Sequence, residues 1–160
     1  MRNKTMIRVV MALLTFAIFV TVSAKEATVS LPKDRVEVYY LHNTFRCLSC
    51  NTIENLLKAA IFGGKTENQK FKTEIEVKPI YKDQVDKKTI TFQSVNIDKK
   101  ENKHVLKDLK AEAKYPVLVL IKDNKVVKSK VLDDAWDLMS DNQKFIDYFQ
   151  NNLNEFLTSK

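Results

Sequence analysis

Two cysteines separated by two residues, Cys47-Leu48-Ser49-Cys50, are the side chains of this 160-residue sequence best suited to chemistry. They stand between a segment typical of a β-strand and a segment with helical periodicity. The free N–H groups at the start of a helix favour an anion, so the first thiol is expected to ionise readily. The spacing also lets the second sulfur reach the first. Because the thiolate is the attacking species in disulfide exchange, the arrangement indicates a redox-active pair.

The flanking residues predict different roles for the two thiols. Cys47 precedes the helix and adjoins Arg46, whose positive charge favours the thiolate, so Cys47 is predicted to be the exposed nucleophile. Cys50 shares the apolar face of the helix with Ile53, so it is predicted to be the shielded thiol. His42 could tune the Cys47 thiolate or serve as a base. Arg46 and His42 are also compatible with ordinary loop positions.

Two other readings of the cysteine pair stay open. The pair could form a static disulfide, although a domain of this size gains little from closing so short a loop. It could also bind Cu(I), because soft thiolates select that ion, with His42 as a third ligand. We assign no metal site, since the sequence offers no clear third ligand.

A strand and a helix must position the two thiols. Residues 35–41 alternate apolar and other side chains and are dense in β-formers, which predicts a strand. After the cysteines, apolar residues with helical spacing run up to Gly63-Gly64, which predicts a helix that ends there. These apolar residues are Ile53, Leu56, Leu57, Ala60 and Ile61. Residues 65–88 suit either a helix or a short strand, and we assign no element to them.

Residues 89–109 are predicted to contain a strand and a helix. The strand, 89–97, has an apolar phase that slips between Phe92 and Val95, which suggests burial on both faces or a bulge. Asp98 and Glu101 resemble a capping box at the start of the helix. The apolar residues that this helix would turn inward are Val105, Leu106 and Leu109.

The last third of the chain predicts a hairpin followed by a long helix. Residues 117–121 are an uninterrupted apolar run, which indicates a central strand, and Asp123-Asn124 predicts a turn into a partner strand. Ser140 or Asp141 can cap the final helix. One face of this helix carries Phe145, Ile146, Phe149, Leu153, Phe156 and Leu157.

Residues 1–24 read as a signal peptide rather than as part of the fold. Basic residues precede an apolar run over 9–22, which is shorter than the roughly 20 residues of a transmembrane helix. Val22-Ser23-Ala24 then offers a cleavage site before Lys25. An uncleaved membrane anchor is the alternative. We therefore expect an exported protein, periplasmic or secreted, with a lead-in over 25–33 and one domain over 34–160.

Composition excludes several function classes. Removing the three basic residues of the signal peptide leaves 24 of the 27 basic residues against 20 acidic ones, a net charge of +4, and only two of the 24 are arginine. Nucleic-acid binding is therefore not expected. Gly63 and Gly64 are the only glycines, so no glycine-rich loop can hold a phosphate. We expect no organic cofactor, no membrane insertion after cleavage, and a monomer.

The strand–Cys-x-x-Cys–helix segment, the later strand and helix, and Pro116 before an apolar strand together resemble the thioredoxin-like superfamily from Val36 to Leu157. The resemblance implies an α/β thioredoxin-like fold with a central mixed sheet flanked by helices. It also implies that Cys47 is the nucleophile and Cys50 the resolving thiol. Tyr115-Pro116, with a cis bond, would form a substrate-facing wall.

The sequence also departs from thioredoxin itself. Phe45-Arg46 precedes the pair and Leu48-Ser49 separates it, where thioredoxin has Trp and Gly-Pro. Leu41 stands where thioredoxin has a buried acid. We therefore expect a divergent exported thiol–disulfide oxidoreductase that exchanges disulfides with protein substrates and with a redox partner. The alternative is a binding module of the same fold, in which the pair is a structural disulfide or a copper ligand pair.

Overall fold

A computed structural model describes residues 31–111 and 114–159. The predicted signal peptide over 1–24 lies outside the described residues, so export stays a prediction. None of the described helices is both long enough and apolar enough to span a bilayer.

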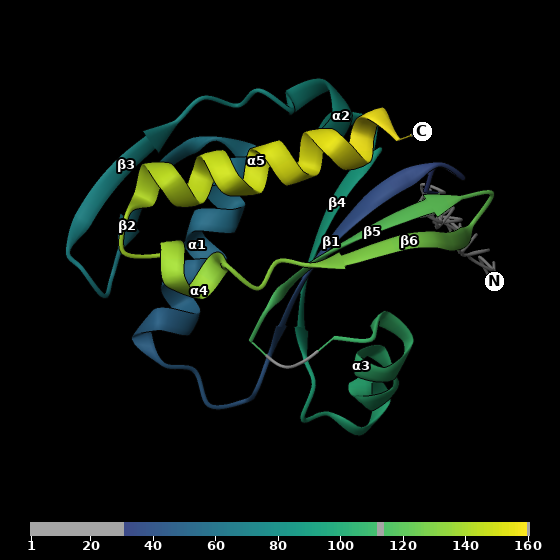
Figure 1. Ribbon diagram of the computed structural model, residues 1–160, viewed down its shortest axis with the longest axis horizontal. Coiled ribbons are helices and arrows are strands. Elements are labelled where there is room, and N and C mark those ends of the chain that lie inside the picture. The colour runs from purple at the N-terminus through teal and green to yellow at the C-terminus, as the bar shows by residue number, and fades with distance from the viewer. Residues whose placement is uncertain (1–30, 112–113, 160) are drawn as a thin grey trace, which may run out of the picture.

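Four strands form a mixed sheet in the order β4-β1-β5-β6 (Figure 1). They are β1 (Arg35–His42), β4 (Ile90–Asn96), β5 (Pro116–Lys122) and β6 (Lys125–Val131). β1 runs parallel to β4 and antiparallel to β5, and β6 is antiparallel to β5. The predicted class, α/β with a central mixed sheet flanked by helices, is therefore confirmed.

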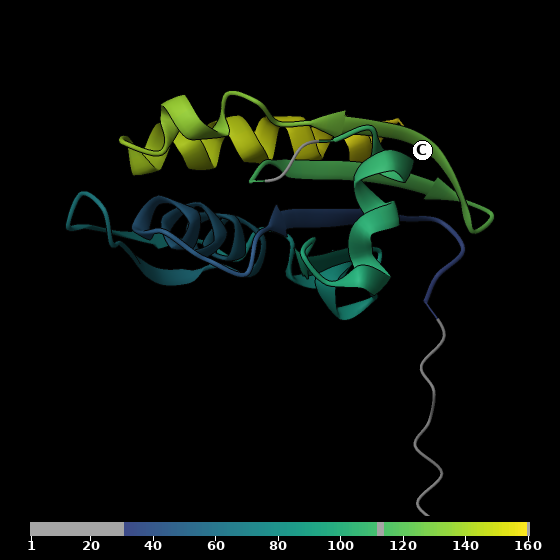
Figure 2. The same cartoon turned by 90° about the horizontal axis from the view of Figure 1, so that it is seen from below.

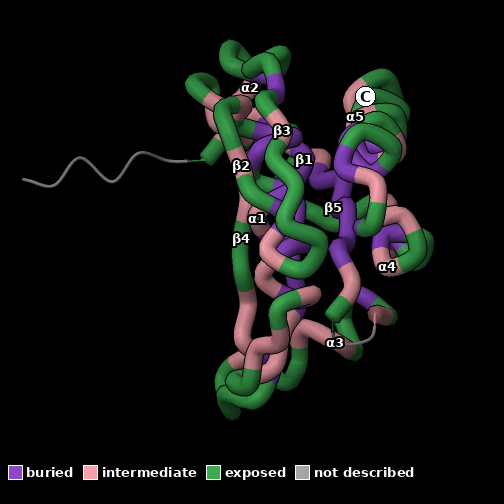
Figure 3. Tube along the Cα trace, turned by 90° about the vertical axis from the view of Figure 1, so that its left-hand side faces the viewer, coloured by how far each residue is buried: buried purple, intermediate pink, exposed green. Residues whose placement is uncertain are grey.

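Helices cover both faces of this sheet. α1 (Leu48–Phe62), the short α4 (Ala135–Leu138) and α5 (Asn142–Thr158) pack on one face, and α3 (Lys103–Leu109) packs on the other. Figure 1 shows α5 and α3 on opposite sides of the strands, and Figure 2 shows α3 in front of them. Burial is greatest along β1 and β5 between these layers (Figure 3).

The alternating side chains of the strands divide the core into two clusters. On the first face, Val36, Val38 and Tyr40 of β1 pack with apolar residues of α1 and α5. On the second face, Leu41 of β1 and Val119 of β5 pack with residues of α3. Because Tyr40 lies near the end of β1, on the face that packs against α1, its side chain belongs to the layer that carries the cysteines.

The segment without a sequence assignment forms a hairpin and a helical turn. β2 (Gly64–Asn68) pairs with β3 (Thr73–Val77) in a separate two-stranded sheet, and α2 (Lys82–Asp86) follows. The buried Asn68 amide nitrogen donates to the Met139 carbonyl at 2.7 Å and to Asn142 Oδ1 at 2.8 Å. These bonds tie the hairpin to the α4–α5 connection.

The capping box expected at Asp98 is wrong. A 3-10 turn at Lys100–Asn102 precedes α3, and no side chain caps either element. Asp98 instead accepts hydrogen bonds from the Thr44 backbone N–H at 2.7 Å and from Asn43 Nδ2 at 3.0 Å. These partners lie on a loop far away in the sequence, so local spacing could not reveal them.

Of the two explanations for the phase slip in the 89–97 strand, a bulge in its pairing with β1 is wrong, because no register shift interrupts that pairing. Both faces of β4 carry apolar contacts, but it is an edge strand and only Ile90 within it is buried. Ile90 and Phe92 pack on the α1 face, whereas Val95 and Ile97 pack on the α3 face. The apolar phase therefore slips because different layers cover the two ends of β4.

The expected hairpin turn and helix cap are confirmed. Asp123 and Asn124 adopt positive φ angles of 49° and 61°, as a type I′ turn between β5 and β6 requires. The Asp141 side chain accepts from the Lys144 N–H at the start of α5.

Candidate functional site

The two cysteines lie where the chain passes from the loop after β1 into α1. Cys47 is the N-cap residue, with an extended backbone, and its Sγ accepts a hydrogen bond from the Cys50 N–H at 3.3 Å. Helix starts leave several N–H groups without a partner in the helix, so this sulfur takes the place of a capping oxygen. Cys50 lies in the first turn of α1 and is buried, with 3% of its surface exposed, whereas Cys47 is partly exposed.

The two thiols differ in the direction of their pKa shifts. Burial opposes ionisation of Cys47, but hydrogen bonds from the Cys50 thiol and from N–H groups of the first turn outweigh it and lower the Cys47 pKa. Burial raises the Cys50 pKa, and the neighbouring Cys47 raises it further. Their Sγ atoms are 2.6 Å apart. Cys47 therefore ionises first, and Cys50 can reach it to form a disulfide.

The start of β5 pairs with the end of β1. Pro116 is in register with Tyr40 of β1, and the Lys114 ammonium group acts on Cys50 in the direction that lowers its pKa. The expected cis bond at Tyr115–Pro116 is wrong, because every peptide bond in the described residues is trans. Pro116 is the first residue of β5, and its carbonyl accepts from the Leu132 N–H at 2.9 Å. Proline has no N–H to donate, and as the first residue of β5 it costs the strand little.

Arg46 lies next to Cys47 in sequence but pairs with another group. Its Nη2 is 2.5 Å from Glu54 Oε2 and donates to the Cys50 carbonyl at 3.4 Å. Its guanidinium carbon lies 5.6 Å from the centroid of the Tyr40 ring. Because the Glu54 carboxylate neutralises its charge, Arg46 orders the first turn of α1 more than it stabilises the Cys47 thiolate.

Glu54 is a buried carboxylate that the sequence prediction missed. It is 6% exposed and forms ion pairs with Arg46 and with Lys58, the latter at 2.6 Å, and it accepts from Ser94 Oγ at 3.2 Å. Burial opposes its ionisation, but the hydrogen bonds from Lys58 and Arg46 lower its pKa. The only local signal was the spacing of Glu54 and Lys58 on one helix face.

Tyr40 was predicted only as a strand residue. Its side chain is fully buried, and its hydroxyl has no hydrogen-bond partner among residues 31–111 and 114–159. Arg46 Nε, next to it, is also buried and unpartnered within the described chain. Burial raises the pKa of Tyr40, as does the charge of Cys50, so the hydroxyl stays protonated. Two buried donors without a partner in the described residues thus belong to neighbouring side chains, Tyr40 and Arg46, and Arg46 also contacts the first turn of α1.

His42 does not contact either cysteine through a hydrogen bond in the described part of the chain. Its Nδ1 donates to the Asn43 carbonyl at 2.8 Å, and its ring stacks at 6.2 Å from the Tyr40 ring. The structure therefore holds His42 at the end of β1, where its ring packs on that of Tyr40.

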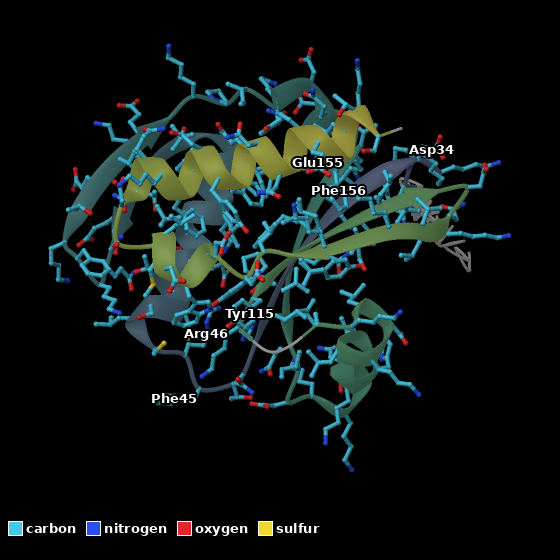
Figure 4. The ribbon with its side chains drawn as sticks, in the orientation of Figure 1. Asp34, Phe45, Arg46, Tyr115, Glu155 and Phe156 are labelled. Atoms are coloured by element: carbon cyan, nitrogen blue, oxygen red, sulfur yellow. The ribbon has the colours of Figure 1, made fainter. Side chains whose placement is uncertain are left out.

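The loop between β1 and α1 is anchored at one end and exposed at the other. Asp98 holds Asn43 and Thr44, as described above, and these hydrogen bonds lower the Asp98 pKa. Phe45 is 86% exposed and Leu48 is 58% exposed, so large apolar side chains flank Cys47 on both sides. In Figure 4 Phe45 lies at the outer edge of this loop, whereas Arg46 lies between the loop and the sheet.

Trp136 fixes the segment that precedes β5. Trp136 Nε1 donates to the Lys114 carbonyl at 2.9 Å, which connects α4 to the segment before β5. Tyr115 is half-buried in this segment (Figure 4).

The described residues contain no group of three or more His, Cys, Asp and Glu side chains placed to hold a metal ion. Comparisons of the chain with protein-family models, with curated proteins and with solved structures gave no match. The arguments below therefore rest on the geometry and chemistry of the site.

Proposed function

We propose that this protein is a thiol–disulfide oxidoreductase that uses Cys47 as nucleophile and Cys50 as resolving thiol. The observation that carries the proposal is the asymmetry of the pair. The partly exposed thiol has the lowered pKa and the buried thiol has the raised one, and their sulfurs lie within bonding reach. A structural disulfide needs no such asymmetry, whereas exchange with a client does.

The exchange follows from this geometry. The Cys47 thiolate attacks a client disulfide and forms a mixed disulfide, and one client sulfur leaves as a thiolate. Cys50 then attacks Cys47 Sγ, which closes the Cys47–Cys50 disulfide and releases the second client sulfur. The reverse sequence oxidises a client dithiol. No organic cofactor takes part in either direction.

The proposal includes a thioredoxin-like fold. Supporting it are the β4-β1-β5-β6 order, the parallel pairing of β1 with β4, and the position of the cysteines at the start of the helix that follows β1. The β2–β3 hairpin and α2 would then be an insertion between that helix and β4. The trans bond before Pro116 is a departure from the family pattern.

Protein clients with apolar side chains near their cysteine suit this site best. Phe45 and Leu48 expose apolar surface on both sides of Cys47, and contact with apolar client side chains would remove that surface from water. Tyr115 and Pro116, at the start of β5, remain the proposed substrate-facing wall.

A redox titration of the purified chain tests the function. We expect the Cys47–Cys50 couple to equilibrate with glutathione or dithiothreitol buffers at a potential between about −270 and −120 mV, the range of catalytic dithiols. A potential below about −300 mV would instead indicate a static disulfide. Tight Cu(I) binding without exchange activity would favour the copper-binding module.

We also propose that the protein is exported. The support comes from the sequence alone: basic residues, an apolar run over 9–22 and small residues before Lys25. Mass analysis of the protein from its native host should find Lys25 at the N-terminus. An intact Met1 in a membrane fraction would replace export with anchoring.

A further inference from the structure

The neighbouring side chains of Tyr40 and Arg46, next to the first turn of α1, contain buried polar groups that make no hydrogen bond in the described structure. Tyr40 is fully buried, and within the described residues neither its hydroxyl nor Arg46 Nε has a hydrogen-bond partner. A buried donor without a partner destabilises the folded state, so native proteins retain few of them, and those few warrant an explanation. Arg46 connects Tyr40 to Cys50, because its guanidinium carbon lies 5.6 Å from the Tyr40 ring centroid and its Nη2 donates to the Cys50 carbonyl at 3.4 Å. Cys50 also gains negative charge during the proposed reaction, and that charge raises the pKa of Tyr40.

The resolving step requires negative charge on the buried Cys50 sulfur. When Cys50 attacks Cys47 Sγ, a Cys50–Cys47 bond forms, the Cys47–client bond breaks, and the electron pair leaves on the client sulfur. The Cys50 proton is lost and finally resides on the released client thiol. Cys50 is only 3% exposed, so water gives its thiolate little stabilisation and a protein donor must supply it.

We propose that the Tyr40 hydroxyl donates a hydrogen bond to the Cys50 sulfur as it becomes a thiolate, and that Arg46, held by Glu54, positions the Tyr40 ring for this task. This inference rests on the proposed function. It assigns Tyr40 a role in the second step, the attack of Cys50 on Cys47 Sγ. Burial keeps the hydroxyl protonated, so it stays a donor throughout.

The surrounding charges leave this role to Tyr40. Arg46 Nη2 contacts Glu54 and the Cys50 carbonyl, and Glu54 contacts Arg46 and Lys58. Arg46 Nε has no partner in the described residues, but these contacts hold its guanidinium in place. Lys114 acts on Cys50 only from an exposed position at the start of β5, where water screens its charge. The Cys47 sulfur is itself the atom under attack. Thr91 carries the other buried hydroxyl without a partner in the described residues, but it is in register with Glu37, on the opposite face of the sheet from Tyr40. Among the described residues, Tyr40 therefore provides the unpartnered buried hydroxyl on the sheet face that packs against α1.

The reaction with 5,5′-dithiobis(2-nitrobenzoate) separates the two steps without a natural client. The Cys47 thiolate releases the first coloured thiolate and retains the second as a mixed disulfide, and attack by Cys50 releases the second. In Tyr40→Phe we expect the second release to slow about tenfold, the effect of one hydrogen bond to a charged group, while the first release keeps its rate. The urea midpoint should not fall, because the lost hydroxyl has no partner in the described structure.

Tyr39→Phe is the matched control on the same strand. The Tyr39 hydroxyl donates to Glu37 and not to the cysteine layer, so this variant should keep both release rates. An unchanged second release in Tyr40→Phe would overturn the inference. Equal slowing of both releases, or equal slowing in the two variants, would also overturn it and indicate a packing effect. If the wild-type first release is no faster than in the urea-unfolded chain, the proposed function itself fails.

Discussion

Cys50→Ser is expected to convert the protein into a trap for its clients. The Cys47 thiolate can still attack a client disulfide, but no second thiol remains to release the product, so mixed disulfides accumulate. The serine hydroxyl can still donate a hydrogen bond toward Cys47, and the N–H groups of the first turn are unchanged, so the initial attack by Cys47 should remain intact. Non-reducing electrophoresis followed by mass spectrometry measures the trapped adducts.

Cys47→Ser is the matched control for the trap. It removes the nucleophile and should abolish both exchange and trapping, while the fold stays intact because serine is a good N-cap residue. The rate of alkylation against pH, with each thiol assigned by peptide mapping, should show Cys47 reacting at lower pH than Cys50 in the wild type. Equal, slow reaction of both thiols and no adduct from Cys50→Ser would contradict the oxidoreductase proposal.

Glu54→Ala is expected to produce the largest loss of stability at the site. It leaves the Arg46 guanidinium half-buried without its carboxylate partner, and breaking such a pair should lower the free energy of unfolding by about 2–3 kcal/mol. The value lies below that of a fully buried pair because 25% of the Arg46 side chain is exposed. Urea unfolding curves of the wild type and the variant measure the difference.

The same pair predicts a dependence on pH. Folding lowers the Glu54 pKa below its usual value of 4.5, so the folded state favours the ionised carboxylate. Its contribution is therefore complete above that value and is lost as the pH falls through the lower pKa of the folded state. The difference between wild type and Glu54→Ala should be constant at neutral pH and shrink in acid.

Asp86→Ala provides the comparison on an exposed helix. Asp86 also pairs with a lysine one helical turn away, Lys82, at 2.5 Å, but both side chains are largely exposed. Water and salt screen that pair, so its removal should change stability far less than removal of Glu54. Similar losses in the two variants would contradict the importance of burial at Glu54.

Much of the architecture was predictable because it depends on local contacts. Alternation over 35–41 and helical spacing after Cys50 correspond to β1 and α1, which were both confirmed. The Asp123-Asn124 turn and the Asp141 cap each depend on residues within one turn of the chain. No element could be assigned to 65–88 from the sequence, because non-local contacts hold the β2–β3 hairpin. Asn68 donates hydrogen bonds to Met139 and Asn142, which are distant in the sequence.

The site itself was predictable only in part. The position of Cys47 at the helix start and the burial of Cys50 follow from their spacing relative to Ile53. The partner of Arg46 did not follow, because Cys47 is its neighbour in sequence whereas Glu54 is its neighbour in space. The cis bond expected before Pro116 came from a resemblance, and the trans bond accompanies strand pairing with Tyr40.

The sequence by itself therefore determined where the cysteine pair lies and which of the two thiols is more exposed. Helix periodicity and capping act over three or four residues, and such signals can be read along the chain. Only the tertiary structure decided what surrounds the pair, because β1 brings Tyr40 under α1, and the order and register of the strands set the partners of Glu54, Asp98 and Pro116. Those contacts join residues far apart in sequence, and burial gives them their energetic effect.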